Sequence, residues 1–282
     1  MASLFGFAQM EFGFLLGPRD GRFLIRNGPG ADARAVLVLS TLGAPERRRL
    51  RGRRGTLVAE AAPEPVPTTR ATVVKAEALG SGEEAAGWLD RIRRDSERAE
   101  SEVEWGLGVL NRALHAYRVS LADPHVRDVA VDNALVVRLG YGAGDEIVDG
   151  RYGEAWELPR AGVRAVKRSM EAPEERFAAV LGGRETVLAC EELVLRARMD
   201  LDGGRWREAA LQARVALEAL LTELRDLPGD RRGALEANRE HVSEAANAAL
   251  RGPLPDELQD ALEAGVELME AALRARRLSS ST

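Results

Sequence analysis

Short apolar runs separated by glycine and proline fill the first 80 residues and predict β-strands. The runs lie at residues 12–16, 22–26, 35–39, 56–59 and 69–76. Gly17, Pro18 and Gly21 favour turn dihedral angles, so we expect the first two runs to form a hairpin. Met10 opens a conventional N-terminal sequence, and we therefore expect residues 1–9 to be an extension that the fold does not need.

Apolar residues from 83 to 122 recur at intervals of three and four, which predicts one long helix with a single buried stripe. Asp123 and Pro124 end this helix, because the residue before a proline avoids helical dihedral angles. A helix of about 40 residues is roughly 60 Å long, which is more than the width of a compact domain. We expect it either to kink near Gly106 and Gly108 or to project and pair, for example with a second copy of the chain.

A further strand is predicted at 134–139, and Gly140, Gly142 and Gly144 follow it. The spacing of these glycines differs from that of a phosphate-binding loop, and the residues after them are acidic. We therefore interpret the glycines as a flexible turn. Residues 147–157 fit either a return strand or an irregular loop.

From residue 173 onward the apolar spacing is helical throughout. We expect helices at 174–201, 205–226, 231–250 and 255–277. The first is either continuous or broken at Gly182 and Gly183. Because each apolar stripe needs a covering partner, we expect antiparallel hairpins. The chain is thus predicted to be α+β, with a small, mostly antiparallel β domain at 1–80, a long helix plus short β element at 81–162, and a helical-hairpin bundle at 163–282.

The composition is that of a globular protein, since 45% of the 282 residues are apolar and 30% are charged. A net charge of −5 argues against a surface built entirely for nucleic acid. The 38 arginines and 2 lysines indicate the codon usage of a GC-rich genome. Cys190 has apolar neighbours and no second cysteine, so we expect a buried thiol and a reducing, cytoplasmic location. No apolar run reaches the roughly 18–20 residues of a membrane span, so we expect no membrane contact.

One segment of the helical half carries a local resemblance. Residues 202–209, Asp-Gly-Gly-Arg-Trp-Arg-Glu-Ala, are followed by Ala213 and Ala216 in an Ala-Leu-rich helix. Over 197–224 this arrangement resembles a tetratricopeptide-type turn and is similar to the hairpin of HEPN domains, a family that includes RNA-cleaving enzymes. Small alanines let two helices approach closely while Trp206 closes the open end, and any alanine-rich antiparallel hairpin would share these features.

The HEPN resemblance implies a closely spaced arginine and histidine, and Arg118 and His125 are a pair of this kind. Such a pair would activate a ribose hydroxyl and stabilise a cleaved phosphate. Val119 departs from the family, which favours a polar residue after the arginine. Pro124 separates His125 from the predicted helix, and the pair precedes the hairpin that carries the resemblance.

Two charged segments are candidates for binding. Asp145, Glu146 and Asp149 are oxygen ligands but lack the EF-hand order, and the histidines lack zinc-site spacing, so we expect no metal and no cofactor. The second segment is a predicted solvated loop with six arginines: Arg47, Arg48, Arg49, Arg51, Arg53 and Arg54. It would bind nucleic acid or an acidic protein by counterion release, although it lacks aromatic residues for base stacking.

No set of residues specifies a reaction, and we interpret the chain as a non-catalytic interaction or scaffold protein that binds a protein partner through helical surfaces. The first alternative is RNA cleavage of the HEPN type through Arg118 and His125. The second is binding of nucleic acid or an acidic partner through the arginine loop at 47–54. Self-association through the long helix is a further expectation.

Overall fold

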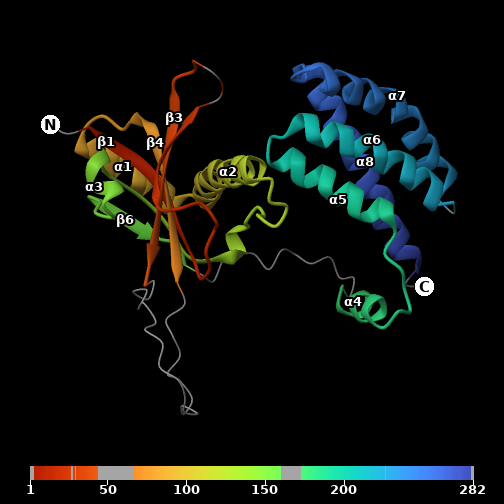
Figure 1. Cartoon of the computed structure of the whole chain (residues 1–282), viewed down its shortest axis with the longest axis horizontal. Coiled ribbons are helices and arrows are strands. Elements are labelled where there is room, and N and C mark those ends of the chain that lie inside the picture. The colour runs from red at the N-terminus through yellow and green to blue at the C-terminus, as the bar shows by residue number, and fades with distance from the viewer. Residues whose placement is uncertain are drawn as a thin grey trace, which may run out of the picture. The chain divides into compact units, whose positions relative to one another are not determined.

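The computed structural model describes residues 3–26, 28, 30–43, 67–159, 173–225 and 227–280 (Figure 1). The chain divides into two compact units, Met1–Ala165 and Val166–Thr282. The first contains an antiparallel sheet with helices, and the second is helical. The predicted α+β class is therefore confirmed.

In the described part of the first unit, the sheet has six antiparallel strands in the order β2-β3-β4-β1-β5-β6. Its strands are β1 (Leu4–Phe12), β2 (Gly21–Arg26), β3 (Ala33–Leu42), β4 (Thr68–Ala78), β5 (Ala134–Ala143) and β6 (Glu154–Glu157). The strands predicted at 35–39 and 69–76 are confirmed within β3 and β4, and 134–139 within β5. The predicted strand at 56–59 lies outside the described residues.

The predicted hairpin at the N-terminus is wrong. The first strand covers Leu4–Phe12 and not 12–16. It pairs with β4 and β5, while β2 pairs with β3, so the two do not form a hairpin. Glycine and proline at 17–21 do form a connection, but the chain leaves β1 at the middle of the sheet and re-enters it at an edge. Local turn chemistry does not specify which strand a segment will pair with.

The expectation that residues 1–9 are dispensable is also wrong. Leu4–Phe12 is hydrogen-bonded to a neighbour on both sides, and its side chains at Phe7, Ala8 and Met10 are buried. The segment is apolar from Leu4 to Ala8, as in a strand buried on both faces, and then alternates polar and apolar residues from Gln9 to Phe12. The first residues of the chain therefore supply most of a central strand.

Two helices, α1 (Gly82–Arg94) and α2 (Ser96–Leu121), lie against one face of this sheet in place of the single predicted helix. The break is at Asp95 and not at Gly106 or Gly108. Asp95 has extended backbone angles, and its side chain accepts a hydrogen bond from the Arg98 N–H at 3.1 Å, which caps α2. The interruption removes the long projecting helix on which the expected self-association rested.

Packing between α2 and the sheet is closest at Gly106. A Cβ placed on this glycine would lie 2.6 Å from the Cβ of Ala8 in β1, so only glycine allows this approach. The core that α1 and α2 cover contains Ala8, Met10, Phe12, Leu37, Leu39, Val73, Ile92, Val103, Leu110, Leu114 and Leu139. The central strand and the helix layer thus meet through two of the smallest residues.

The glycines after residue 139 do not form the predicted flexible turn. Gly140 and Gly142 lie inside β5, and a Cβ on Gly140 would lie 2.5 Å from the carbonyl oxygen of Glu154 in β6. The short helix α3 (Gly144–Val148) follows, and β6 is the return strand that the sequence left undecided. The strands β5 and β6 belong to the same sheet as β1–β4. The β strands before and after the predicted boundary at residue 80 therefore form one sheet.

The second unit is helical, as expected. Its helices are α4 (Pro173–Leu181), α5 (Ala189–Asp202), α6 (Trp206–Glu223), α7 (Gly229–Arg251) and α8 (Asp256–Ser280). A short 3-10 turn, η1 (Val131–Asn133), belongs to the first unit. The predicted segment 174–201 is broken around Gly182 and Gly183, and the three later helices are confirmed. The helices α5–α8 enclose a core rich in alanine and leucine. No helix among the described residues combines the length and the apolar character that crossing a membrane requires.

The close contact at Gly106 predicts a measurable difference between two neighbouring glycines. Gly106→Ala should destabilise the first unit by about 1–3 kcal/mol, because the new methyl group overpacks the α2–β1 contact. Gly108→Ala, at an exposed position with no atom near the new Cβ, should instead stabilise it by about 1 kcal/mol. Urea denaturation of both variants checks this, and equal midpoints would contradict the contact.

Candidate functional site

The turn between α5 and α6 is fixed by one buried arginine. The Nε of Arg205 donates to Asp200 Oδ1 at 2.7 Å, and its Nη2 donates to the carbonyl oxygen of Met199 at 3.0 Å. Gly204 has a positive φ of 66°, which favours glycine, and a Cβ on Gly203 would collide with the guanidinium. The Gly-Gly-Arg sequence therefore closes the hairpin, a role that we did not assign to Arg205 from the sequence.

The two helices of this hairpin approach through alanines. Ala197 of α5 and Ala209, Ala213 and Ala216 of α6 are all fully buried, and Trp206 packs partly buried against the same core. The expected antiparallel, alanine-lined hairpin is therefore present over 197–224. Its relationship to any family stays a prediction.

The side of this hairpin that faces away from the core exposes four apolar side chains. Leu195 and Met199 on α5 are 56% and 45% exposed, and Leu211 and Val215 on α6 are 39% and 56% exposed. The core-facing residues of α5 are Cys190, Val194, Ala197 and Leu201, and those of α6 include Ala209, Ala213, Ala216 and Leu220. At 100° per residue the four exposed residues point the opposite way. We refer to these four residues as the outer α5–α6 surface.

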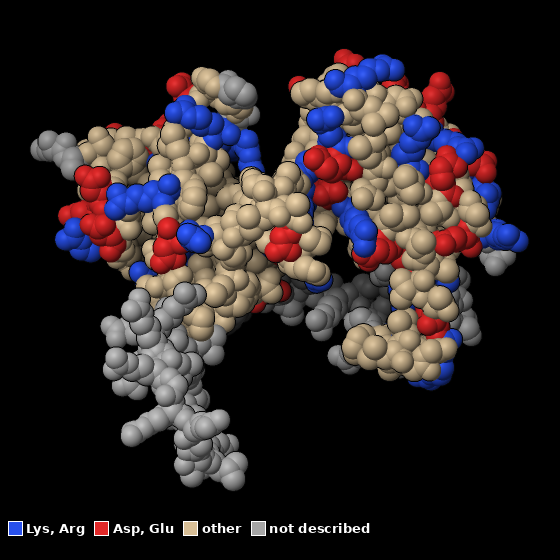
Figure 2. Space-filling model, viewed as in Figure 1, with Lys and Arg blue, Asp and Glu red and all other residues tan. Residues whose placement is uncertain are grey.

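The four residues also form two level pairs. Because the helices are antiparallel and turn at Arg205, residues equally distant from it lie side by side. Met199 is thus level with Leu211, and Leu195 is level with Val215, one helical turn further along. The four exposed side chains thus lie at two matching levels of α5 and α6, on a unit whose visible surface mixes charged and uncharged side chains (Figure 2).

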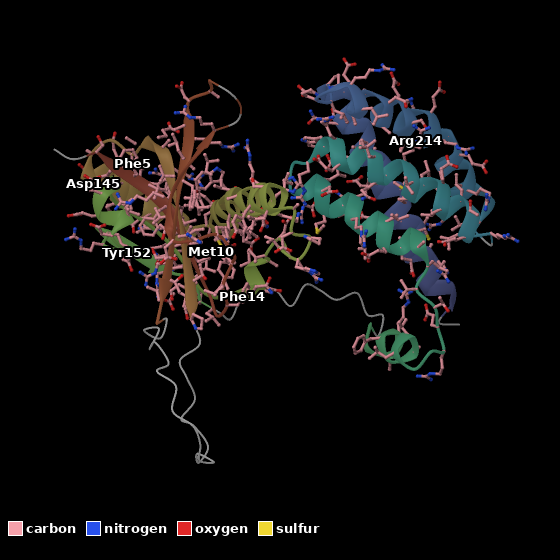
Figure 3. All side chains as sticks on the ribbon, viewed as in Figure 1. Phe5, Met10, Phe14, Asp145, Tyr152 and Arg214 are labelled. Atoms are coloured by element: carbon pink, nitrogen blue, oxygen red, sulfur yellow. The ribbon has the colours of Figure 1, made fainter. Side chains whose placement is uncertain are left out.

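Charged side chains around this surface are paired within the unit. Arg196 lies 2.8 Å from Glu192 on α5, and Arg198 makes two hydrogen bonds of 3.0 Å to Glu270 of α8. Arg214, labelled in Figure 3, donates to the side chain of Asn247 on α7 at 3.1 Å. What this surface offers to a partner is therefore chiefly apolar area.

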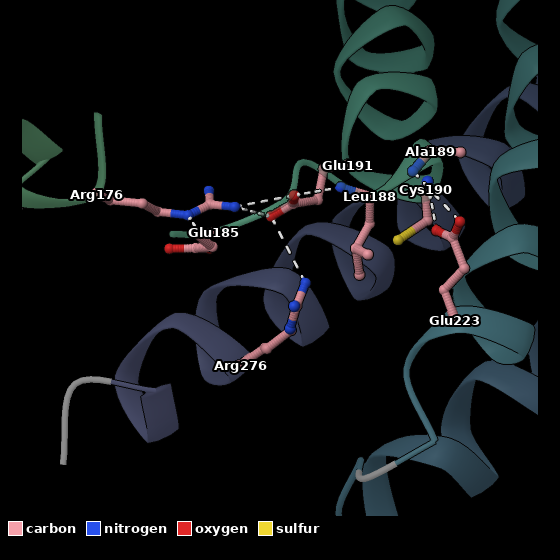
Figure 4. Close-up of polar contacts among 8 residues, drawn as sticks. All are labelled: Arg176, Glu185, Leu188, Ala189, Cys190, Glu191, Glu223 and Arg276. Atoms are coloured by element: carbon pink, nitrogen blue, oxygen red, sulfur yellow. Dashed lines mark hydrogen bonds and ion pairs between the residues drawn. The ribbon is translucent and has the colours of Figure 1, made fainter. Parts of the chain in front are cut away.

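A cluster of ionic contacts joins α4, α5 and α8 (Figure 4). The buried Glu191 carboxylate accepts from Arg176 Nη2 at 2.7 Å and from the Leu188 N–H at 3.0 Å. Arg276 of α8 lies 3.9 Å from the same carboxylate, and Arg176 also contacts Glu185 at 2.7 Å. Removing one partner from a buried pair leaves an uncompensated charge, so this cluster fixes α4 to the start of α5.

Cys190 is fully buried beside this cluster, as expected from its apolar neighbours. Burial, reinforced by the nearby Glu223 carboxylate, raises the pKa of the Cys190 thiol to about 12. Because the thiolate is the reactive form, this thiol is not a nucleophile near neutral pH. The carboxylate of Glu223 accepts the backbone N–H groups of Cys190 at 2.9 Å and Ala189 at 3.4 Å, and thereby caps α5 from a neighbouring helix.

The other face of the sheet in the first unit, opposite α1 and α2, carries a polar network that the sequence did not reveal. Gln9 is buried and donates to Thr72 Oγ1 at 3.0 Å. Arg138 donates to Gln9 Oε1 at 3.1 Å and to Glu11 at 2.9 Å, and Arg70 donates to Glu11 at 3.0 Å. These side chains lie on three adjacent strands in register, so they fix the pairing of β4, β1 and β5.

The predicted catalytic pair is not brought together. The guanidinium of Arg118 on α2 lies 2.7 Å from Nδ1 of His115, one turn earlier on the same helix. His125 is exposed beyond the end of α2, and its backbone N–H donates to the Asp123 carboxylate. This part of the chain places a histidine beside Arg118, but it is not the histidine that the spacing indicated.

Of the two charged segments that the sequence offered as candidate binding sites, the structure describes the acidic one. Asp145 lies exposed on α3 (Figure 3), and Asp149 makes exposed ion pairs of 3.4 Å with Arg22 and Arg151. Within the described part of the chain, no three acidic, histidine or cysteine side chains are grouped as a metal site would require. The arginine loop lies outside the described residues: Arg47, Arg48, Arg49, Arg51, Arg53 and Arg54.

The fold and these surfaces define a two-unit α+β protein with a helical-hairpin unit at its C-terminal side. Comparison of the chain with protein-family models, with curated proteins and with solved structures finds no match. The function is therefore argued from the residues of this chain alone.

The Glu223 cap predicts an acid-sensitive contribution to the stability of the second unit. The backbone donors of Cys190, and then of Ala189, lower the pKa of the Glu223 carboxylate from its ordinary value. A carboxylate with a lowered folded-state pKa stabilises the fold above its unfolded pKa of about 4.3, and this stabilisation is lost as pH falls through the folded value. Glu223→Gln should lower the stability at pH 7 and weaken its dependence on acid.

Thermal denaturation between pH 7 and pH 3 measures this effect. Glu267→Gln, at an exposed position of α8, is the matched control and should follow the wild-type profile. Identical profiles for Glu223→Gln and the wild type would show that the cap does not stabilise α5.

Proposed function

We propose that the chain is a non-catalytic binding protein whose outer α5–α6 surface accepts an amphipathic helix of a protein partner. The observation that supports this is the exposure of four apolar side chains at matching levels of two adjacent antiparallel helices: Leu195, Met199, Leu211 and Val215. Helix-binding surfaces use side chains of this kind at intervals of one turn.

A helix is the occupant that this surface suits, because of its shape and its chemistry. Adjacent antiparallel helices lie about 8–10 Å apart and leave a shallow groove into which the ridge of a third helix packs. The backbone polar groups within α5 and α6 are satisfied inside the helices, so an extended segment would gain no main-chain hydrogen bonds here. The neighbouring charges are already paired within the unit, which favours an apolar face on the partner.

The expected affinity is modest. Full burial of a large aliphatic side chain contributes about 1.5–3 kcal/mol, and these four side chains are already about half buried, so together they contribute on the order of 4 kcal/mol. Association also costs translational and side-chain freedom. The surrounding side chains must therefore contribute as well, and we expect reversible binding in the micromolar range or weaker.

Charge placed on the outer α5–α6 surface should weaken partner binding without unfolding the unit. Leu195→Glu with Val215→Glu changes one residue on each helix at solvent-exposed positions, and each charge would be desolvated on binding. We expect a loss of affinity of about tenfold or more. The measurement is affinity capture from the native cell, followed by titration of the purified partner and of a peptide spanning its amphipathic helix.

The matched control is Leu250→Glu on α7, which is 66% exposed and lies outside the surface. It should bind like the wild type. Unchanged binding by the Leu195→Glu, Val215→Glu variant, or equal losses in both variants, would contradict the proposal. Sedimentation at two concentrations tests whether the partner is a second copy, and metal-independent RNA cleavage abolished by His125→Ala would contradict the non-catalytic role.

A further inference from the structure

The sheet of the first unit ends in an edge strand, β2, which carries exposed apolar and basic side chains. Among the strands of the described residues, β2 pairs with β3 alone. Every second residue of an edge strand directs its N–H and C=O groups away from the sheet, where they can pair with another strand. At the far end of β2 the carbonyl oxygen of Arg26 already accepts a hydrogen bond from Arg112 at 2.8 Å, so the available edge is Gly21–Ile25.

Apolar side chains accompany this edge on both faces of the sheet. Phe23 and Leu24 are 41% and 53% exposed, and consecutive strand residues point to opposite faces. A strand added beside β2 would cover part of each side chain. The combination of hydrogen-bonding groups and apolar area is the requirement for binding an extended peptide by strand addition.

Arginines outnumber acidic residues around this edge, where Asp20 and Asp32 are also exposed and Asp20 already accepts two hydrogen bonds from Thr41. Arg22 and Arg26 lie on β2 itself, Arg34 lies on the adjacent strand and Arg19 precedes β2, and all four are exposed. Figure 2 shows basic side chains gathered over this end of the sheet. The acidic residue paired with β2 is Asp149, in an exposed 3.4 Å ion pair with Arg22, and exposed pairs of this kind contribute little and exchange readily.

We propose that the β2 edge binds an extended, acidic segment of a protein partner by adding it to the sheet as a further strand. Carboxylates four residues apart on such a segment would face Arg22 and Arg26, which lie on the same face of β2. The main-chain hydrogen bonds would give affinity, and the arginines would select acidic sequences.

A second copy of this chain fits the edge less well. Antiparallel pairing of two β2 strands about Leu24 would place Arg22 of each copy opposite Arg26 of the other, and directly opposed like charges destabilise a strand pair. The surface is thus complementary to an acidic strand and not to itself.

The test uses the full chain and a fluorescent probe, a short N-acetylated peptide of alternating glutamate and valine. Binding should slow hydrogen exchange at residues 21–26 and should weaken as salt increases. Arg22→Glu with Arg26→Glu should reduce affinity about tenfold or more. The control Arg225→Glu with Arg251→Glu makes the same change of net charge at exposed positions of the second unit and should bind like the wild type.

Two further probes separate strand addition from simple attraction of charge. A peptide with the same glutamates but with proline in place of valine lacks the N–H donor at every second residue and is disfavoured in a strand, so it should bind much more weakly. Equal binding of this peptide, tighter binding of a single-stranded RNA oligonucleotide, or unchanged exchange at 21–26 would overturn the proposal. The Leu195→Glu, Val215→Glu variant should bind the acidic probe normally, so this test does not depend on the proposed helix-binding function.

Discussion

The contact between Gly106 of α2 and Ala8 of β1 is the constraint on which the first unit depends. β1 is the strand that joins β4 to β5, and α2 lies across it. A larger residue at either position would lift the helix from the sheet and open the core around Met10 and Leu110. The other face of the sheet carries the network of Gln9 and Arg138 together with a smaller apolar cluster in which Ile147 of α3 packs with Phe7 and Val74.

The second unit satisfies a similar constraint with different residues. Alanines separate α5 from α6, and a Cβ on Gly265 of α8 would lie 2.9 Å from Val242 of α7. Small residues in these interfaces shorten the distances between helices, while larger side chains such as Leu217 and Leu262 fill the core.

The sequence predicted the elements of this protein better than their pairing. Apolar periodicity located β3, β4 and the last three helices, because these signals depend only on neighbouring residues. It predicted the ends of the helical segment but not its division into two helices at Asp95. The side chain of Asp95 caps α2, and aspartate is a common residue at the start of a helix. It treated residues 1–9 as an extension, since nothing local shows that β4 and β5 will lie on either side of Leu4–Phe12.

For the candidate sites, too, the sequence predicted local features but not long-range contacts. Gly203 and Gly204 predicted the turn before α6 from local chemistry, but the outer α5–α6 surface required knowledge of which apolar residues the core would use. Arg118 and His125 match the HEPN pattern in spacing, but α2 ends at Leu121, and the histidine in contact with Arg118 is His115. Long-range contacts such as those of Arg138 with Gln9 and Glu11 depend on strand order, which no spacing in the chain reveals.

The two proposed surfaces expose different kinds of groups to a partner, main-chain hydrogen-bonding groups at one and apolar side chains at the other. This difference determines which partner each one binds. The β2 edge presents main-chain hydrogen-bonding groups, which are directional and accept only an extended chain in register. The outer α5–α6 surface presents apolar area, which is not directional and selects mainly for shape. The two surfaces belong to different units and require different backbone conformations, so a single short segment cannot occupy both. On these proposals the chain would hold an acidic strand and an apolar-faced helix independently, which is the arrangement required of a scaffold.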